Sequence, residues 1–219
     1  MIHLLGKIPD NVCVAVSGGS DSMAVLDFLN SGKREVTAIY FNHGTSHGEV
    51  AKRFVRDYCM KKCIPLIDGE IKRERKKIES LEEYWRNERY LFFKSQTAPV
   101  VTAHHLDDVV EWWVYSCLHG EGQLIPYENE KYGIIRPFLT TTKSDLSEWN
   151  ERHDVPFVED PSNQSNDHMR NFIRNEMMSQ ILKVNPGISK VVKKKVLKVY
   201  EAREKIEKYF TIVKSKEMS

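Results

Sequence analysis

The sequence predicts an α/β fold, in which a doubly wound parallel sheet is followed by a C-terminal helical extension. Three observations carry this prediction. Short β-branched runs alternate with segments of helical periodicity, a glycine pair directly follows the first run, and helical patterns dominate the last part of the chain. In such a sheet ligands collect beyond the carboxyl ends of the strands, so candidate site residues are sought there.

The first half of the chain supplies four predicted strands, each a short apolar run bounded by turn residues: 11–17, 36–41, 64–67 and 99–102. Apolar residues elsewhere in this half recur at helical spacing, which predicts four helices: 23–29, 49–62, 81–95 and 106–118. Strand and helix therefore alternate, and this order favours a parallel sheet.

The pattern changes beyond Gly120. A polar loop and a short apolar stretch come first: 121–133 and 134–139. Three helices are predicted after them: 145–152, 169–183 and 188–210. Thr142 or Ser144 is a candidate cap for the first of these helices. We divide the chain into an α/β domain, 1–140, and a helical extension, 141–219, that completes the site and carries a basic tail.

The composition is that of a globular protein. Hydrophobic residues make up 41% of the chain and aromatic residues 10%, which is enough for a buried core and excludes a disordered protein. The apolar runs at 12–16 and 38–41 are far too short to span a bilayer, and the first residues lack the pattern of a secretory signal. We expect a cytoplasmic protein with no membrane contact.

Charge is distributed unevenly along the chain. Up to Leu182 there are 22 basic and 27 acidic residues, and from Lys183 onward there are 11 and 4, which together give the 33 and 31 of the whole chain. The tail is therefore the expected contact for a polyanion. The alternative is that its lysines form an ordinary solvated helix face.

Four cysteines occur in the chain: Cys13, Cys59, Cys63 and Cys117. Cys59 and Cys63 lie four positions apart on one face of a predicted helix, which is compatible with part of a metal or sulfur site. No second cysteine pair completes such a site. We therefore favour reduced cysteines that pack as small apolar residues.

A glycine- and serine-rich loop joins the first predicted strand to the first helix: Ser17, Gly18, Gly19, Ser20, Asp21 and Ser22. Glycine lets the backbone approach a phosphate closely, and the helix N-terminus offers unpaired N–H groups. Asp21 repels phosphate unless a cation lies between them, so it is a candidate Mg²⁺ ligand. The loop lacks the lysine of a Walker motif. The alternative is a tight turn without a ligand.

A second group of polar residues opens the fourth predicted helix. His104, Asp108 and Glu111 share one helix face if the helix begins near His104. Such a face can hold Mg²⁺ or an ammonium group and can accept a proton from an amine. The alternative is a solvated helix start, in which Asp107 and Asp108 only favour the helix dipole.

Arg170 and Arg174 lie four positions apart on the predicted helix that follows the turn sequence Glu-Asp-Pro-Ser-Asn at 159–163. This spacing places both guanidinium groups on one face, where they can bind a phosphate or an adenylate. The alternative is surface charge.

Several of these segments resemble known families. Ser-Gly-Gly-Ser-Asp-Ser at 17–22 resembles the pyrophosphate loop of the N-type ATP pyrophosphatases, whose PP-loop fold is adenine nucleotide alpha hydrolase-like and which cleave ATP between its α- and β-phosphates. Thr-Ala-His-His-Leu-Asp-Asp-Val-Val-Glu at 102–111 and Glu-Asp-Pro-Ser-Asn with the downstream Arg-Asn-x-x-Arg are similar to segments of the tRNA(Ile)-lysidine synthetases. The Asn-His-Gly, Arg-x-x-Arg-Tyr and Arg-Pro-Phe-Leu segments at 42–44, 86–90 and 136–139 agree with the same family.

The resemblance implies a role for each matched position. It implies catalytic residues: Asp21, His104, Asp108, Glu111, Arg170 and Arg174. It implies an ATP site that contains the loop 17–22 together with Phe41, Asn42, His43, His104 and Asp107. It assigns the amino groups of free lysine to Asp108 and Glu111, and Mg²⁺ to Asp21. For tRNA, Arg86 and Arg89 and the tail lysines are the expected contacts: Lys190, Lys193, Lys194 and Lys195.

The reaction that the resemblance implies has two steps: ATP, with Mg²⁺, adenylates the wobble cytidine of an isoleucine tRNA with a CAU anticodon, and free L-lysine then displaces AMP. Two departures from the family pattern are Trp85, where a small residue is usual, and His119, where an arginine is expected. A sulfur-inserting tRNA thiolase and an inactive tRNA-binding relative are the alternatives. A homodimer is compatible with the sequence, which carries no residue-level signal for one.

Overall fold

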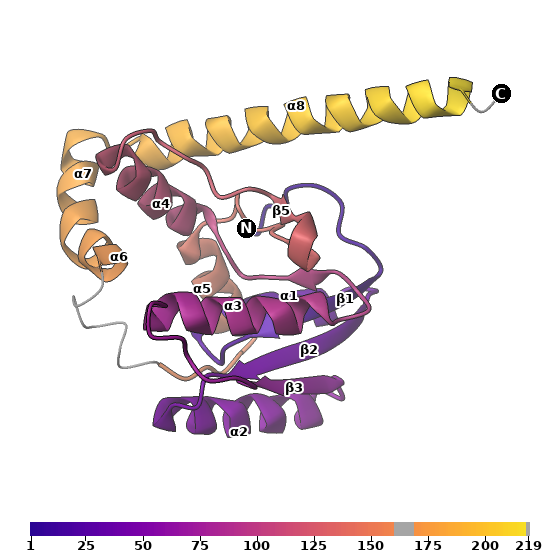
Figure 1. The fold of residues 1–219 in the computed structure, drawn as a ribbon. Helices are drawn as coiled ribbons and strands as arrows, with labels where there is room; N and C mark the ends of the chain where they lie inside the picture. Colours follow the sequence, from indigo (N-terminus) through magenta and orange to yellow (C-terminus); the bar gives the residue numbers. More distant parts are fainter. Residues whose placement is uncertain (160–168, 218–219) are drawn as a thin grey trace.

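A computed structural model describes residues 1–159 and 169–217, with only the backbone for Arg170 and 210–217. Its centre is a six-stranded sheet of order β3-β2-β1-β4-β6-β5 (Figure 1). Five strands run parallel: β1 (Asn11–Val16), β2 (Glu35–Asn42), β3 (Leu66–Glu70), β4 (Val100–Val101) and β6 (Ile134–Ile135). The edge strand β5 (Glu128–Asn129) pairs antiparallel with β6.

Helices follow the strands in the order that the sequence predicts. The first five α-helices are α1 (Ser20–Asn30), α2 (Ser46–Lys61), α3 (Leu81–Lys94), α4 (Leu106–Leu118) and α5 (Lys143–Arg152). The helical extension continues with α6 (Met169–Phe172), the π-helical turn η3 (Ile173–Met177), α7 (Met178–Val184) and α8 (Ile188–Glu217). Helix therefore alternates with strand up to α4 and dominates beyond β6.

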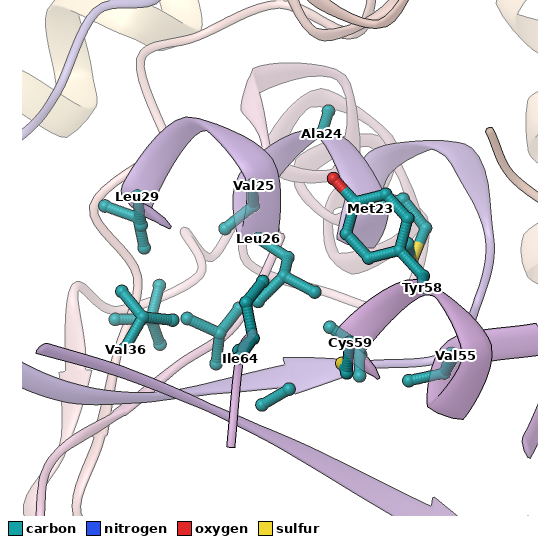
Figure 2. Packing of buried hydrophobic residues seen from close by; sticks show 14 of the residues in the cluster. Met23, Ala24, Val25, Leu26, Leu29, Val36, Val55, Tyr58, Cys59 and Ile64 are labelled. Carbon is teal, nitrogen blue, oxygen red and sulfur yellow. The ribbon is translucent and has the colours of Figure 1, made fainter. Parts of the chain in front are cut away.

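Alternating side chains of the sheet belong to different layers of the core. Val12 and Val14 of β1 pack in one apolar cluster with α1, α2 and α5, whereas Cys13 packs in another with Phe93 of α3. Figure 2 shows the first cluster, in which Met23 and Leu26 of α1 lie near side chains of α2. Helices thus cover both faces, and the predicted doubly wound α/β fold is confirmed.

A buried carboxylate ties three of these helices together. Asp27 of α1 accepts hydrogen bonds from Tyr58 Oη at 2.7 Å and Lys62 Nζ at 3.0 Å, and its other oxygen accepts from Trp149 Nε1 at 3.0 Å. Burial alone would raise the pKa of Asp27, but these three donors hold it below its ordinary value of 3.8. Helix α5, the first of the predicted extension, is therefore fixed against α1.

Most predicted elements occur, many with bounds that differ by a few residues, and the predicted helix 169–183 is divided into α6, η3 and α7. The third strand begins at Leu66 rather than at residue 64, because Cys63 takes a left-handed conformation (φ 54°) and the Ile64 N–H bonds back to Cys59 O. The predicted loop 121–133 contains β5 and a short 3₁₀ turn, η1 (Glu130–Tyr132). The last helix continues to Glu217.

The start of α8 packs against α4, and the helix then runs beyond the body of the protein to the C-terminus (Figure 1). Val192 and Val196 of α8 are buried in a cluster with Val109 and Val110 of α4. Along the described part of the chain, no helix is both long and apolar enough to cross a membrane.

Candidate active site

The site lies where the strand order reverses. β1 has β2 on one side and β4 on the other, so the connections that leave β1 and β4 diverge and open a crevice at their carboxyl ends. A cavity of about 970 Å³ occupies this position. Its walls come from the loop after β1, the ends of β2 and β4, the second half of α3, the starts of α2, α4 and α5, residues 157–159, and the turn α6–η3.

The loop after β1 has a defined internal structure. The Ser22 hydroxyl donates to Gly19 O at 2.9 Å and accepts from the Ser17 N–H at 3.2 Å. Gly18 has a φ of 87°, and its carbonyl accepts from Val158 N at 2.9 Å. The N-cap of α1 is Gly19, and in the described part of the chain no side chain caps this helix. The N–H groups of its first turn can therefore bind an anion, as the predicted phosphate loop requires.

Asp21 has the surroundings of a cation ligand. Its Oδ1 atom is buried and, among the described residues, has no hydrogen-bond partner, while Oδ2 lies 3.4 Å from His105 Nε2. A buried carboxylate oxygen without a donor is costly unless a cation binds it. The donor chemistry thus fits Mg²⁺, which prefers carboxylate oxygen.

His105, which the sequence reasoning did not single out, lies at the centre of the carboxylates. It caps α4: its N–H donates to Asp108 Oδ2 at 3.0 Å, and its Nδ1 accepts from the Asp108 N–H at 3.4 Å. Burial lowers the pKa of His105, but Asp21, Asp108 and Asp107 outweigh burial and raise it above 6.5. The imidazole therefore links the phosphate loop to the start of α4.

Arg174 reaches the carboxylates of α4 from η3. Its Nε and Nη2 donate to the two oxygens of Glu111 at 2.7 and 2.8 Å, and Nη2 also donates to Asp108 Oδ1 at 3.2 Å. These contacts raise the pKa of Arg174, and the largest cause of the rise is the hydrogen bond to Glu111. The structure thus brings together three of the residues predicted as catalytic. The three carry one more negative than positive charge.

The helix face predicted for His104, Asp108 and Glu111 needs a correction. α4 begins at Leu106 and His105 is its cap, so His104 precedes the helix. His104 still lines the cavity, and its Nδ1 lies 2.8 Å from Thr102 Oγ1. Asp108 also lines the cavity. Glu111 does not line it but is hydrogen-bonded to Arg174, which does.

The end of β2 supplies an aromatic wall. Phe41 and His43 line the cavity, and the His43 ring lies 5.4 Å from that of Trp85 on α3. Burial and the charge of Arg89 lower the pKa of His43 to about 4, so its ring is neutral at pH 7. Asn42 points elsewhere: its amide donates to Glu49, and its Oδ1 accepts from Gly44 N at 2.8 Å.

Two cations on the cavity wall have no carboxylate partner among the described residues: Arg89 and Lys143. Lys143 was missed by the sequence reasoning. It is the first residue of α5, and its N–H donates to Asp107 Oδ2 at 2.7 Å. Asp107 therefore supports the start of α5, and Lys143 lines the same cavity as the phosphate loop, which contains no basic residue.

The remaining predicted residues lie away from the cavity or outside the description. Arg86 is exposed on α3, and the tail lysines lie on α8, outside the cavity lining: Lys190, Lys193, Lys194 and Lys195. The side chain of Arg170 and residues 160–163 of the predicted signature lie outside the described residues. Among the described lining residues there is no cysteine.

Comparison with known proteins agrees with this geometry. The family model of the PP-loop domain matches residues 4–181. The chain belongs to the PP-loop family. Its curated relatives include the bifunctional protein TilS/HprT of Listeria innocua, 33% identical over 205 residues, which cover 85% of this chain and 32% of that protein. A tRNA(Ile)-lysidine synthase of Staphylococcus aureus is 31% identical over 194 residues, which cover 80% of this chain and 44% of that enzyme.

This PP-loop protein therefore spans less than half the length of these curated relatives. Among solved structures, the U34-tRNA thiolase NcsA of Methanococcus maripaludis, with its [4Fe-4S] cluster, superposes with a TM-score of 0.71 at 15% identity. The match covers 89% of this chain and 73% of that one, and it shows a shared fold.

Proposed function

We propose that this PP-loop protein is an ATP-dependent tRNA(Ile)-lysidine synthetase, which joins free lysine to the wobble cytidine of a CAU-anticodon tRNA. The observation that carries the proposal is that Asp108 and Arg174 line the same cavity as Asp21, with His105 between Asp21 and Asp108 and with Glu111 bound to Arg174. Such a site can hold a phosphate group at the loop and an ammonium group at the neighbouring carboxylates. The relatives named as lysidine synthases support the choice of substrates.

Binding of ATP is assigned to the phosphate loop and its neighbours. The N–H groups at the start of α1 and the hydroxyls of Ser17 and Ser20 bind the phosphates, and Phe41 and His43 contact the adenosine. Asp21 Oδ1 holds Mg²⁺, which supplies charge neutralisation of the phosphates when bound. Lys143 adds a further positive charge beside them.

Attack by lysine is assigned to the carboxylates of α4. The excess negative charge of Asp108, Glu111 and Arg174 attracts the lysine ammonium, which loses one proton to solvent to give the amine. Asp108, which faces the cavity, takes up a second proton as this amine attacks the activated carbon. The bond from carbon 2 of the cytidine to oxygen breaks, AMP leaves with that oxygen, and the new carbon–nitrogen bond forms. Arg174 keeps the Glu111 carboxylate oriented through its two hydrogen bonds.

A sulfur-inserting reaction is less well supported. It requires thiolates or an iron–sulfur site near the bound base, and among the described residues no cysteine lines the cavity. Burial raises the pKa of Cys59 to about 11 and also raises that of Cys13, so neither thiol is activated.

The proposal is tested by following AMP formation from ATP with a CAU-anticodon tRNA. We expect AMP release to require the tRNA, and we expect Asp21→Asn to abolish it. Asp57→Asn is the matched control, because Asp57 is exposed on α2 outside the cavity lining. AMP release that is the same without the tRNA, or that persists in the Asp21→Asn variant, contradicts the proposal.

A further inference from the structure

The segment that connects β3 to α3, residues 71–80, is strongly basic and lies at the edge of the sheet where the cavity opens. Five of its ten residues are basic: Lys72, Arg73, Arg75, Lys76 and Lys77. Glu70, the last residue of β3, pairs in register with Asn42, and the neighbouring Phe41 and His43 line the cavity. The segment therefore starts beside the candidate active site.

One of these basic residues has a structural task. Arg73 donates to Glu88 at 2.7 Å and to both oxygens of Glu79 at 2.9 and 2.8 Å, and its guanidinium lies 4.7 Å from the centre of the Tyr84 ring. Asn87 donates to Glu79 at 3.1 Å, and Tyr84 Oη donates to Arg73 O. The Arg73 hydrogen bond lowers the pKa of Glu79 to about 2. The base of the segment is thus fixed to α3.

The other cations of the segment face solvent. Lys72, Arg75, Lys76 and Lys77 are all exposed. In the part of the chain that the structure describes, none of these four pairs with a carboxylate, and Arg75 reaches only Glu79 O at 3.4 Å. Arg73 forms ion pairs with Glu79 and Glu88. The nearby Glu82 and Glu83 lie in the first turn of α3, where a negative charge interacts favourably with the helix dipole.

We propose that these four exposed cations bind the phosphate backbone of the RNA whose base enters the cavity. The segment 71–80 that carries them is called the edge loop. The inference rests on the proposed function. Clustered lysines bind phosphates as point charges without reading the base, and this is the contact that positions a nucleic acid. In Figure 1 the start of α8 lies beside α7 and α4, apart from β3 and α3, which the edge loop joins, so the edge loop adds a contact separate from the predicted tail lysines.

The test compares two variants with the same change of charge. One is Arg75→Glu/Lys76→Glu/Lys77→Glu in the edge loop. The control is Lys7→Glu/Lys33→Glu/Lys94→Glu, because these exposed lysines precede β1, β2 and β4 and therefore lie at the opposite edge of the sheet. Binding of an RNA stem–loop with a CAU anticodon to the full 219-residue chain is measured by fluorescence anisotropy over a range of salt concentrations.

We expect the edge-loop variant to bind the stem–loop at least about 10-fold more weakly, with a salt slope that is smaller by roughly 2, and the control to stay close to the wild type. ATP affinity, measured in parallel, should be unchanged in both. Equal RNA affinity and slope for the two variants, with clear binding by the wild type, overturn the edge-loop inference alone. If the wild type does not bind the stem–loop, the proposed function itself fails and the inference fails with it.

Discussion

Arg174 donates two hydrogen bonds to the carboxylate of Glu111, at 2.7 and 2.8 Å, although 63 positions separate the two residues in the chain. The pair joins η3 of the helical extension to α4 of the sheet domain. Glu111 is buried, and the guanidinium of Arg174 donates to both of its carboxylate oxygens. The candidate site is therefore complete only when the extension is in place.

Loss of this pair should destabilise the fold, and lysine at position 174 should not replace arginine. We expect Arg174→Lys to lower the free energy of unfolding by about 1.5–3 kcal/mol, because lysine cannot form the two parallel hydrogen bonds. Urea unfolding of Arg174→Lys, Glu111→Gln and the double variant forms the measurement. Strictly additive effects of the two changes would contradict a direct coupling between them.

Lys143 should contribute to ATP affinity. Lys143 lines the same cavity as the phosphate loop, which contains no basic residue. We expect Lys143→Ala to weaken ATP binding by about 10-fold and Lys143→Arg to retain most of it, since a single charge-assisted contact has roughly that effect. Titration calorimetry with ATP and Mg²⁺ is the measurement, with Lys94→Ala as the control. Wild-type affinity in the Lys143→Ala variant would remove Lys143 from the site.

Gly18 should tolerate a side chain less well than Gly44. Both have positive φ, 87° and 78°, so alanine costs about 1 kcal/mol of backbone strain at either position. A Cβ at Gly18 would also lie 3.0 Å from Val158 Cγ2, whereas one at Gly44 meets nothing within 4 Å. We expect Gly18→Ala to reduce ATP affinity and thermal stability more than Gly44→Ala. Equal losses would show that the contact with Val158 relaxes freely.

Asp27 should make the free energy of unfolding depend on pH. Its folded pKa is below 3.8, so its contribution is complete above the unfolded value and disappears as the pH falls through the folded value. At pH 7 we expect Asp27→Asn to cost about 2–4 kcal/mol, because all three partners are donors and asparagine offers them only one acceptor oxygen.

The measurement is the free energy of unfolding of the wild type and Asp27→Asn between pH 7 and pH 3. The difference between the two proteins should shrink toward the acid end of this range. A difference that is constant over the range would mean that the pKa of Asp27 is the same in the folded and unfolded chains.

The sequence predicted the sheet domain well because its signals are local. Buried β-branched runs and helical spacing depend on neighbouring residues, and α4 was predicted with the bounds that the structure has. The phosphate loop was predicted for the same reason, since two glycines, three serines and an aspartate directly follow a buried strand. The PP-loop family was predicted from residues 17–22 and is confirmed by the match of the PP-loop domain to residues 4–181.

Contacts between distant segments were beyond the reach of these patterns. His105 caps α4 with an imidazole, whereas the capping signature that is read from sequence uses serine or threonine, so the placement of His104 on the helix face was wrong. Lys143 looks like an ordinary solvated lysine until α5 is packed against α1. The pairing of Arg174 with Glu111, although each was predicted singly, depends on the path of the chain between them.

The central claim is that lysine is joined to a tRNA, and the most direct test is to incubate the protein with ATP, Mg²⁺, radiolabelled lysine and a CAU-anticodon tRNA. The same tRNA with a UAU anticodon is the control. The account predicts stable label in the first tRNA, none in the second, and loss of label with Asp21→Asn or with Glu111→Gln at low lysine concentration. AMP formation without label in the CAU tRNA would contradict lysine as the nucleophile.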